Sequence, residues 1–308
     1  MNITIIGAGA MGSLFGSFLV RTGQSVLLVD TWQEHVNAIN TRGLGVEFNG
    51  KIKRVDIVAA HDIPADGKSD LVIIFVKSTQ TEQVAPGAVK CLKSNGFVLT
   101  LQNGMGNADG IAKYVPLDRV IAGTTSHGAT LLEPGLIRHA GVGPTVMGMW
   151  SEKSNAGLEN IKELFLRAGI DTRIDDNIPV VIWKKLVINI GINAITALTG
   201  IRNGSILDAP PTGELVRSAV EEACKVALAH GVELPDNMAD QVFKVAKATG
   251  SNRSSMGQDV DNRRQTEIDA INGAIVTLAE EKAISVPVNK TLTALIQTVQ
   301  KNYNNKEN

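Results

Sequence analysis

The chain has 308 residues, a formal net charge of −1 and only two cysteines, Cys91 and Cys224. A length of this order favours two domains, and so small a net charge gives no support for binding nucleic acid or an anionic membrane. Two distant cysteines make neither a disulfide framework nor a metal-ligand cluster. The five histidines have no ligand spacing with each other. We therefore expect a cytoplasmic protein with no metal site, no nucleic-acid partner and no membrane partner.

The first thirty residues predict a strand–helix–strand unit with a glycine-rich turn. A β-branched strand over 2–6 runs directly into Gly7-Ala8-Gly9-Ala10-Met11-Gly12, and an apolar-periodic helix leads to a second strand, 26–30. In this context G-x-G-x-x-G indicates dinucleotide binding: the first glycine permits the tight turn, the second admits the pyrophosphate, and the third lets helix and strand pack closely. The alternative is a glycine-rich turn without a ligand.

Asp30 ends the second strand, where an acid can accept hydrogen bonds from both ribose hydroxyls of NAD and would repel a 2′-phosphate. The next residue, Thr31, offers no cation. The sequence therefore favours NADH over NADPH. The alternative is that Asp30 only caps the following helix.

The rest of the first domain, which we place at residues 1–176, continues the α/β pattern. Fully apolar strands are predicted over 71–76 and 97–101, as in a parallel sheet covered on both faces. Lys77 and Asn103 follow their carboxyl ends, where ligands of open α/β sheets bind, unless both are solvent-facing loop residues. The remaining predicted elements are a helix at 32–41, a hairpin at 43–60 turning at Asn49-Gly50, a strand at 119–125, antiparallel strands over 129–149, a helix at 155–168 and a strand at 171–174.

A long apolar helix over 178–198 carries three polar residues at a spacing of four, Lys185, Asn189 and Asn193. A step of four residues drifts by only about 40° around a helix, so these side chains form one stripe. Buried ammonium and amide groups need partners, which points to a ligand cavity; the alternative is a solvated helix edge. The helix has the length of a membrane span, but its lysines and asparagines would be costly in lipid.

The second domain, residues 177–308, is predicted to be all-helical, with helices over 212–230, 236–249, 258–282 and 288–303. Ser255 lies just before the third of these, at a helix start that can hold a carboxylate. Glu267 borders the apolar stripe of that same helix. It could serve the site, or it could form an ordinary surface ion pair with Arg263 or Arg264. The fold class is therefore a Rossmann-type α/β domain followed by an all-α domain.

These motifs together resemble the ketopantoate reductase (2-dehydropantoate 2-reductase) family, and the resemblance runs essentially from end to end. The residues that carry it are Gly7-x-Gly9-x-x-Gly12, Lys77, Gln102-Asn103-Gly104-Met105-Gly106, Trp183-Lys184-Lys185-Leu186 with Asn189 and Asn193, Asn203-Gly204, Ser254-Ser255-Met256-x-Gln258-Asp259, and Thr266-Glu267-Ile268-Asp269-x-Ile271-Asn272-Gly273.

The resemblance implies an oxidoreductase that reduces 2-dehydropantoate to (R)-pantoate by hydride from a nicotinamide cofactor, in pantothenate and coenzyme A synthesis. It implies that Lys185 is the general acid and that Glu267 interacts with it or with the substrate hydroxyl. It also implies a substrate-binding group and a cofactor-binding group. The former comprises Asn103, Asn189, Asn193, Asn203 and Ser255, and the latter Gly7, Gly9, Ala10, Met11, Gly12, Lys77 and again Asn103. Asp30 joins the cofactor-binding group from the residue argument above and not from the resemblance.

One position departs from the family pattern. Members commonly use NADPH and carry a basic residue after the second strand, where this chain has Asp30-Thr31. NADH is therefore the cofactor expected from the residues, and NADPH the usual cofactor of the family. Two other functions stay open: a reductase of another 2-keto or 3-keto acid, and a nucleotide-binding sensor without chemistry. The oligomeric state, a homodimer included, is also open.

Overall fold

The computed structural model describes residues 1–151 and 155–303. These residues divide into two compact units. The first comprises residues 1–102 and 106–178, and the second comprises residues 103–105 together with the chain from 179 onward. The short segment 103–105 thus belongs to the second unit although it follows a strand of the first.

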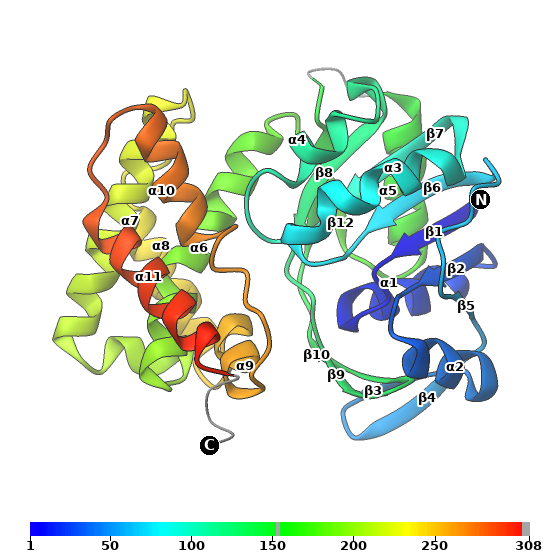
Figure 1. Ribbon diagram of the computed structural model, residues 1–308, viewed down its shortest axis with the longest axis horizontal. Helices are drawn as coiled ribbons and strands as arrows, with labels where there is room; N and C mark the ends of the chain where they lie inside the picture. Colours follow the sequence, from blue (N-terminus) through cyan, green and yellow to red (C-terminus); the bar gives the residue numbers. More distant parts are fainter. Residues whose placement is uncertain (152–154, 304–308) are drawn as a thin grey trace. The chain divides into compact units, whose positions relative to one another are not determined.

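The first unit is built on an eight-stranded sheet with the order β12-β11-β8-β7-β6-β1-β2-β5 (Figure 1). Its strands are β1 (Asn2–Ile6), β2 (Ser25–Val29), β5 (Val58–Ala60), β6 (Ser69–Ile74), β7 (Leu92–Thr100), β8 (Val120–Thr125), β11 (Thr145–Met149) and β12 (Thr172–Ile174). Neighbouring strands are parallel except for β11, which pairs antiparallel with β8. Strand order reverses at β1, which lies between β2 and β6. In open α/β sheets the ligand site lies at such a switch point.

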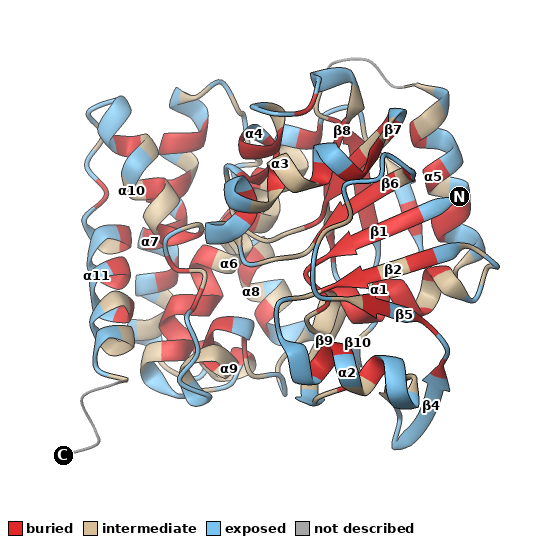
Figure 2. Cartoon of the chain, turned by 45° about the vertical axis from the view of Figure 1, so that its right-hand side comes forward, coloured by how far each residue is buried: buried red, intermediate tan, exposed pale blue. Residues whose placement is uncertain are grey.

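Helices cover this sheet and bury its central strands, which Figure 2 shows in red. They are α1 (Ala10–Val20), α2 (Gln33–Arg42), α3 (Thr81–Cys91), α4 (Asn107–Ala112) and α5 (Ala156–Arg167). Helices α1 and α5 meet through Phe15 and Phe165, whose ring centroids lie 5.9 Å apart. Both rings are fully buried, so α1, which follows the glycine-rich turn, is anchored in the core of this unit.

A second, four-stranded sheet has the order β4-β3-β10-β9 and consists of β3 (Leu44–Phe48), β4 (Lys51–Val55), β9 (Gly128–Glu133) and β10 (Leu136–Gly141). The predicted hairpin turn is confirmed, because Asn49 and Gly50 both have positive φ, as its tight turn requires. The prediction for 129–149 is only partly right. Strand β11 joins the main sheet rather than β10, because its partners are chosen by contacts distant in sequence.

The described part of the second unit is helical, and α6 (Ile178–Thr199) begins at its boundary and runs through its core. By length and composition alone α6 could cross a membrane. However, more than half of its most apolar window is buried, and its apolar side chains belong to one core cluster with those of the helices around it. Those helices are α7 (Pro210–Ala229), α8 (Met238–Ala248), α10 (Asn272–Glu281) and α11 (Pro287–Lys301).

The prediction of a continuous helix over 258–282 is wrong. The chain forms a short helix α9 (Ser255–Asp261), leaves the helical conformation, and resumes it only in α10. Ile268 and Ile271 are buried at 0% and 1% exposure, as a helical stripe would require, but they lie in the irregular segment. Glu267 therefore stands on a loop between two helices.

Candidate active site

The glycine-rich turn lies directly after β1, and two of its glycines are required by the protein itself. Gly7 has a φ of +94°, and a Cβ atom there would lie 2.5 Å from the backbone nitrogen of Val76. A Cβ on Gly12 would lie 2.0 Å from the carbonyl oxygen of Gly7. Around Gly9, in contrast, a Cβ would meet nothing within 4 Å. The space beside Gly9 is thus open to a ligand.

The first turn of α1 is suited to an anion. Its N-cap residue is Gly9, which has no side chain to cap the helix, and the first turn contains no acidic residue. The N–H groups of Ala10, Met11 and Gly12 have no partner within an α-helix, and the helix dipole adds partial positive charge at this end. These residues therefore fit the pyrophosphate of a dinucleotide, at the point where strand order reverses.

Asp30 and Lys77 follow the carboxyl ends of β2 and β6; Asp30 is half-buried, and Lys77 is exposed. The Asp30 carboxylate accepts a hydrogen bond from the backbone N–H of Trp32 at 2.9 Å. Since α2 begins at Gln33, this bond orders the chain before the helix and does not satisfy an N–H within its first turn. Lys77 immediately precedes a short 3₁₀ turn at Ser78–Gln80.

A buried hydrogen-bond chain supports the glycine-rich turn, and no sequence motif predicts it. The His35 Nδ1 accepts from the Gly135 N–H at 3.0 Å, and the Ser13 hydroxyl donates to the Ala8 carbonyl at 2.7 Å. The contact of 3.3 Å between His35 and Ser13 must then use the Nε2–H as donor. Burial lowers the pKa of His35, partly offset by Asp30, and so favours this neutral tautomer. The hydrogen-bond chain ties the turn to the β9–β10 hairpin through His35, which lies 100 residues before Gly135.

In the second unit, α6 presents the polar stripe expected from the sequence. Lys185 and Asn189 are half-buried, and Asn193 is buried. The stripe extends about 12 Å along the helix axis, at about 1.5 Å per residue. Burial lowers the pKa of Lys185 from 10.5 to about 8, while the nearby charge of Glu267 acts to raise it. The stripe is therefore not an ordinary solvated edge, because water would leave the ammonium with its usual pKa.

Glu267 and Asn103 meet in the second unit. The Asn103 amide donates to the Glu267 carboxylate at 3.4 Å, and the Met105 N–H donates to the Ala270 carbonyl at 3.0 Å. The segment that follows β7 thus packs against the loop between α9 and α10. Lys185, Glu267 and Asn103 form one constellation, although 164 residues separate the last two.

Ser254, the residue before α9, lies close to the far end of the stripe. Thr196, one turn beyond Asn193 on α6, donates to the Ser254 hydroxyl at 2.7 Å, and this hydroxyl also caps α9 by accepting from the Gly257 N–H. Ser255 follows and is exposed. Asn203 is held differently. It is buried, and its amide donates to Thr249 Oγ1 at 2.9 Å. Its backbone N–H donates to the Asn252 carbonyl at 3.0 Å, so these hydrogen bonds tie Asn203 to the segment after α8.

Among residues 1–151 and 155–303, no group of three or more His, Cys, Asp or Glu side chains could hold a metal ion. His127 and His139 do meet, with 3.2 Å between ring nitrogens, a proximity that their spacing in the sequence does not reveal. The second unit offers an ammonium with a lowered pKa, a neighbouring carboxylate and a row of amides. Such a set can stabilise a developing oxyanion and protonate it.

Comparison with known proteins identifies the family. The family model described as ketopantoate reductase PanE/ApbA matches residues 3–152, and its C-terminal counterpart matches residues 177–300. The chain belongs to the ketopantoate reductase family. Membership makes it an oxidoreductase that uses a nicotinamide cofactor, and its α/β-then-helical architecture is the one predicted.

Individual relatives match this family member over nearly their whole length. The 2-dehydropantoate 2-reductase of Halobacterium salinarum is 36% identical, and the match covers 98% of this chain and 99% of the relative. A PanE/ApbA family ketopantoate reductase from Ralstonia eutropha has a TM-score of 0.91 at 32% identity, covering 99% of this chain and all of the other. D-mandelate dehydrogenase, solved with NADH and anilino(oxo)acetate, has a TM-score of 0.93 at 30% identity, covering 99% of both chains.

Proposed function

We propose that this member of the family reduces 2-dehydropantoate to (R)-pantoate and does so with Lys185 as general acid. The observation that carries the proposal is the half-buried Lys185 on α6, with a pKa lowered to about 8 and Glu267 as its charged neighbour. The relatives named 2-dehydropantoate 2-reductase support the choice of substrate. Both the substrate and the cofactor are water-soluble small molecules, and we place the reaction in the cytoplasm.

A reduced nicotinamide supplies the hydride when it is bound. As the carbonyl carbon is reduced, negative charge develops on its oxygen, and the Lys185 ammonium stabilises this charge more in the transition state than in the ground state. The ammonium then gives its proton to the oxygen and becomes a neutral amine, which water reprotonates. A pKa of about 8 keeps most of the lysine protonated at neutral pH and makes it a better proton donor than an ordinary lysine.

Glu267 keeps Lys185 in its charged form, because a nearby carboxylate favours the ammonium over the amine. Asn103 donates to the same carboxylate and fixes its direction. Asn189 and Asn193 continue the stripe with amide donors and acceptors for the substrate. Ser255 lies beyond the stripe's end, at the start of α9, where its hydroxyl can bind the substrate carboxylate.

Asn203 completes the proposed substrate group indirectly. Its amide donates to Thr249, so it supports the chain that leads from α8 to Ser254 and Ser255. In the first unit, the backbone from Gly7 to Gly12 binds the pyrophosphate, with Lys77 beside it at the carboxyl end of β6.

We propose NADH as the preferred cofactor, because Asp30 would bind the ribose hydroxyls and repel a 2′-phosphate. The D-mandelate dehydrogenase structure, solved with NADH, supports this choice. The test is the double substitution of Asp30→Ala with Thr31→Arg, which should move the ratio of kcat/KM values towards NADPH. An unchanged ratio would show that Asp30 does not select the cofactor.

The decisive assay follows the absorbance of NADH, and separately of NADPH, with ketopantoate. Oxidation of NADH in preference to NADPH supports both the substrate and the cofactor. The alternative is reduction of a different 2-keto acid; the chain is also similar to D-mandelate dehydrogenase, but the relatives named 2-dehydropantoate 2-reductase favour ketopantoate. Phenylglyoxylate and a panel of further 2-keto acids therefore belong in the same assay. Tight binding of NADH with no oxidation by any keto acid would instead indicate a sensor.

A further inference from the structure

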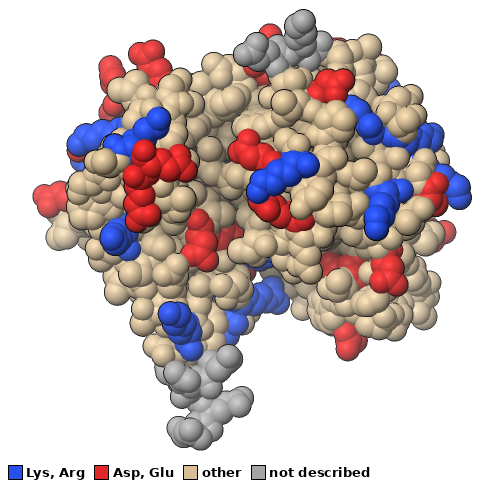
Figure 3. All heavy atoms as spheres, turned by 45° about the horizontal axis from the view of Figure 1, so that its top comes forward, with Lys and Arg blue, Asp and Glu red and all other residues tan. Residues whose placement is uncertain are grey.

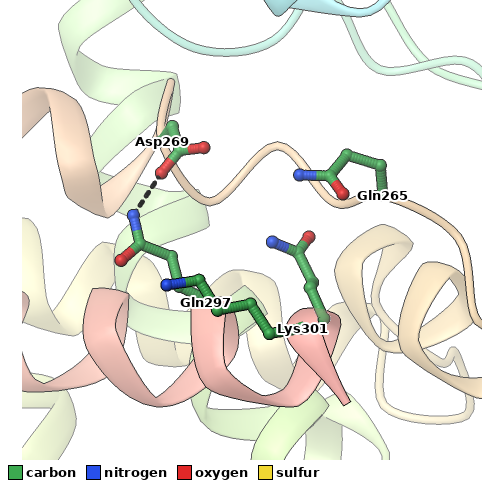
Figure 4. Close-up of a pocket in the computed structure, with 5 residues that line it drawn as sticks. Gln265, Asp269, Gln297 and Lys301 are labelled. Carbon is green, nitrogen blue, oxygen red and sulfur yellow. Dashed lines mark hydrogen bonds between the residues drawn. The ribbon is translucent and has the colours of Figure 1, made fainter. Parts of the chain in front are cut away.

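The loop that carries Glu267 is held from the side of α11 by two glutamines. Gln300 accepts a hydrogen bond from the backbone N–H of Thr266 at 2.6 Å. Gln297 donates to the Asp269 carboxylate at 2.7 Å, a bond drawn in Figure 4. The two glutamines are three residues apart, so they project from the same face of the helix. Their partners flank Glu267 in sequence, Thr266 directly before it and Asp269 two residues after it.

The two bonds differ in what they fix. The bond to Gln300 engages main chain directly before Glu267, next to a Thr266 side chain that is 2% exposed. The Thr266 hydroxyl also accepts from the Ile268 N–H at 3.2 Å. The bond from Gln297, in contrast, ends on the exposed side chain of Asp269. Only the first constrains the backbone dihedral angles that aim the Glu267 carboxylate.

The other side of the loop is also fixed. A Cβ on Gly104 would lie 2.6 Å from the Ala270 carbonyl oxygen, and the same oxygen accepts from the Met105 N–H. The Glu267 carbonyl accepts from both the Ala270 and Ile271 N–H groups, which closes a single turn. The irregular segment is thus held by hydrogen bonds from α11 and from the segment around Met105, although it is not a helix. An acid on a loop needs such support to keep a defined position.

We propose that Gln300 is a positioning residue for Glu267, acting through its hydrogen bond to the Thr266 backbone. The proposal rests on the role proposed above for Glu267. The glutamines border a surface hollow of about 340 Å³ together with Gln265, Asp269 and Lys301 (Figure 4). Gln265 on the loop and Gln297 on α11 both face the hollow, which therefore lies where α11 contacts the loop.

The test compares Gln300→Leu with Gln297→Leu, the same substitution one turn earlier on the same helix. We expect Gln300→Leu to lower kcat/KM for the keto acid by on the order of 10-fold, since small misplacements of catalytic groups are costly. Gln300→Leu should also lower the pH above which reduction declines, as removal of the Glu267 charge would. Gln297→Leu should leave both quantities near those of the wild type. NADH binding, followed by fluorescence, should be the same in all three proteins and shows that each is folded.

Two further variants separate this inference from the function on which it rests. Gln300→Glu retains an oxygen acceptor and should restore kcat/KM without lowering the pH limit. In a Glu267→Gln background, Gln300→Leu should cause no further change. Equal losses in Gln300→Leu and Gln297→Leu would overturn the inference, since they would indicate general loosening of α11. If Glu267→Gln itself changes neither kcat/KM nor the pH limit, the proposed role of Glu267 fails instead.

Discussion

Lys185 should destabilise the folded protein, and Lys185→Met should therefore raise its thermal stability while abolishing reduction. Burial lowers the pKa of this lysine from 10.5 to about 8 even with Glu267 nearby. At about 1.4 kcal/mol for each unit of pKa, the folded state disfavours the ammonium by about 3 kcal/mol. Methionine has a similar length and carries no charge, so it should recover up to this amount.

The sign of the effect fixes its pH dependence. Below pH 8 both the folded and the unfolded chain hold the proton on Lys185, and the full cost is present. Between pH 8 and 10.5 only the unfolded chain holds it, so this contribution to wild-type stability improves as the pH rises. The advantage of Lys185→Met should consequently be largest at neutral pH and should shrink towards pH 10.

The assay is thermal unfolding at pH 7 and pH 9.5, with Lys184→Met as the matched control on the adjacent residue. We expect Lys185→Met to raise Tm at pH 7 by up to roughly 6–12 °C, at about 2–4 °C for each kcal/mol. Its kcat should fall by at least about 10²-fold, with NADH binding retained. A Lys185→Met protein no more stable than Lys184→Met, or an advantage independent of pH, would refute the reasoning.

Two further predictions concern one residue of each unit, Glu267 in the second and Gly12 in the first. Glu267→Gln removes the charge that raises the pKa of Lys185. The basic limb of the profile of kcat/KM against pH should therefore move below pH 8 by on the order of one pH unit. An unchanged basic limb would count against the interaction between Glu267 and Lys185. Gly12→Ala places a Cβ 2.0 Å from the Gly7 carbonyl oxygen, and should weaken NADH binding at least about 10-fold and lower stability by about 1–3 kcal/mol. Wild-type NADH affinity in that variant, measured by fluorescence titration, would contradict the geometry.

Local sequence patterns were sufficient to predict the structure wherever residues close in sequence determine the backbone conformation. The glycine-rich turn is recognisable because the strand, the glycine spacing and the helix follow one another within a few residues. The steric demand on Gly12 also arises within the turn, whereas that on Gly7 comes from Phe75 and Val76 after β6. The polar stripe of α6 is recognisable because helical periodicity alone aligns Lys185, Asn189 and Asn193. The placement of these residues follows from the sequence, whereas their catalytic and binding roles stay predictions.

Sequence patterns led to wrong predictions where contacts between residues distant in sequence determine the local conformation. The isoleucines at 268, 271 and 275 have helical spacing, yet the chain before them leaves the helix, because the bonds to Gln300 and Met105 hold the loop in another form. No window of sequence contains both partners. Strand β11 is a second example, since its apolar run fits either sheet and only the pairing with β8 selects one.

The apolar character of α6 also has a functional consequence. Judged by composition, the helix resembles a membrane span, but in the structure its apolar residues form the core of the second unit. The same surroundings desolvate Lys185 and bring its pKa towards neutrality. A more polar helix would leave the lysine with its ordinary pKa, a poorer proton donor at neutral pH. The sequence feature that looks least catalytic, a run of isoleucine and valine, is therefore what would make the lysine an effective acid.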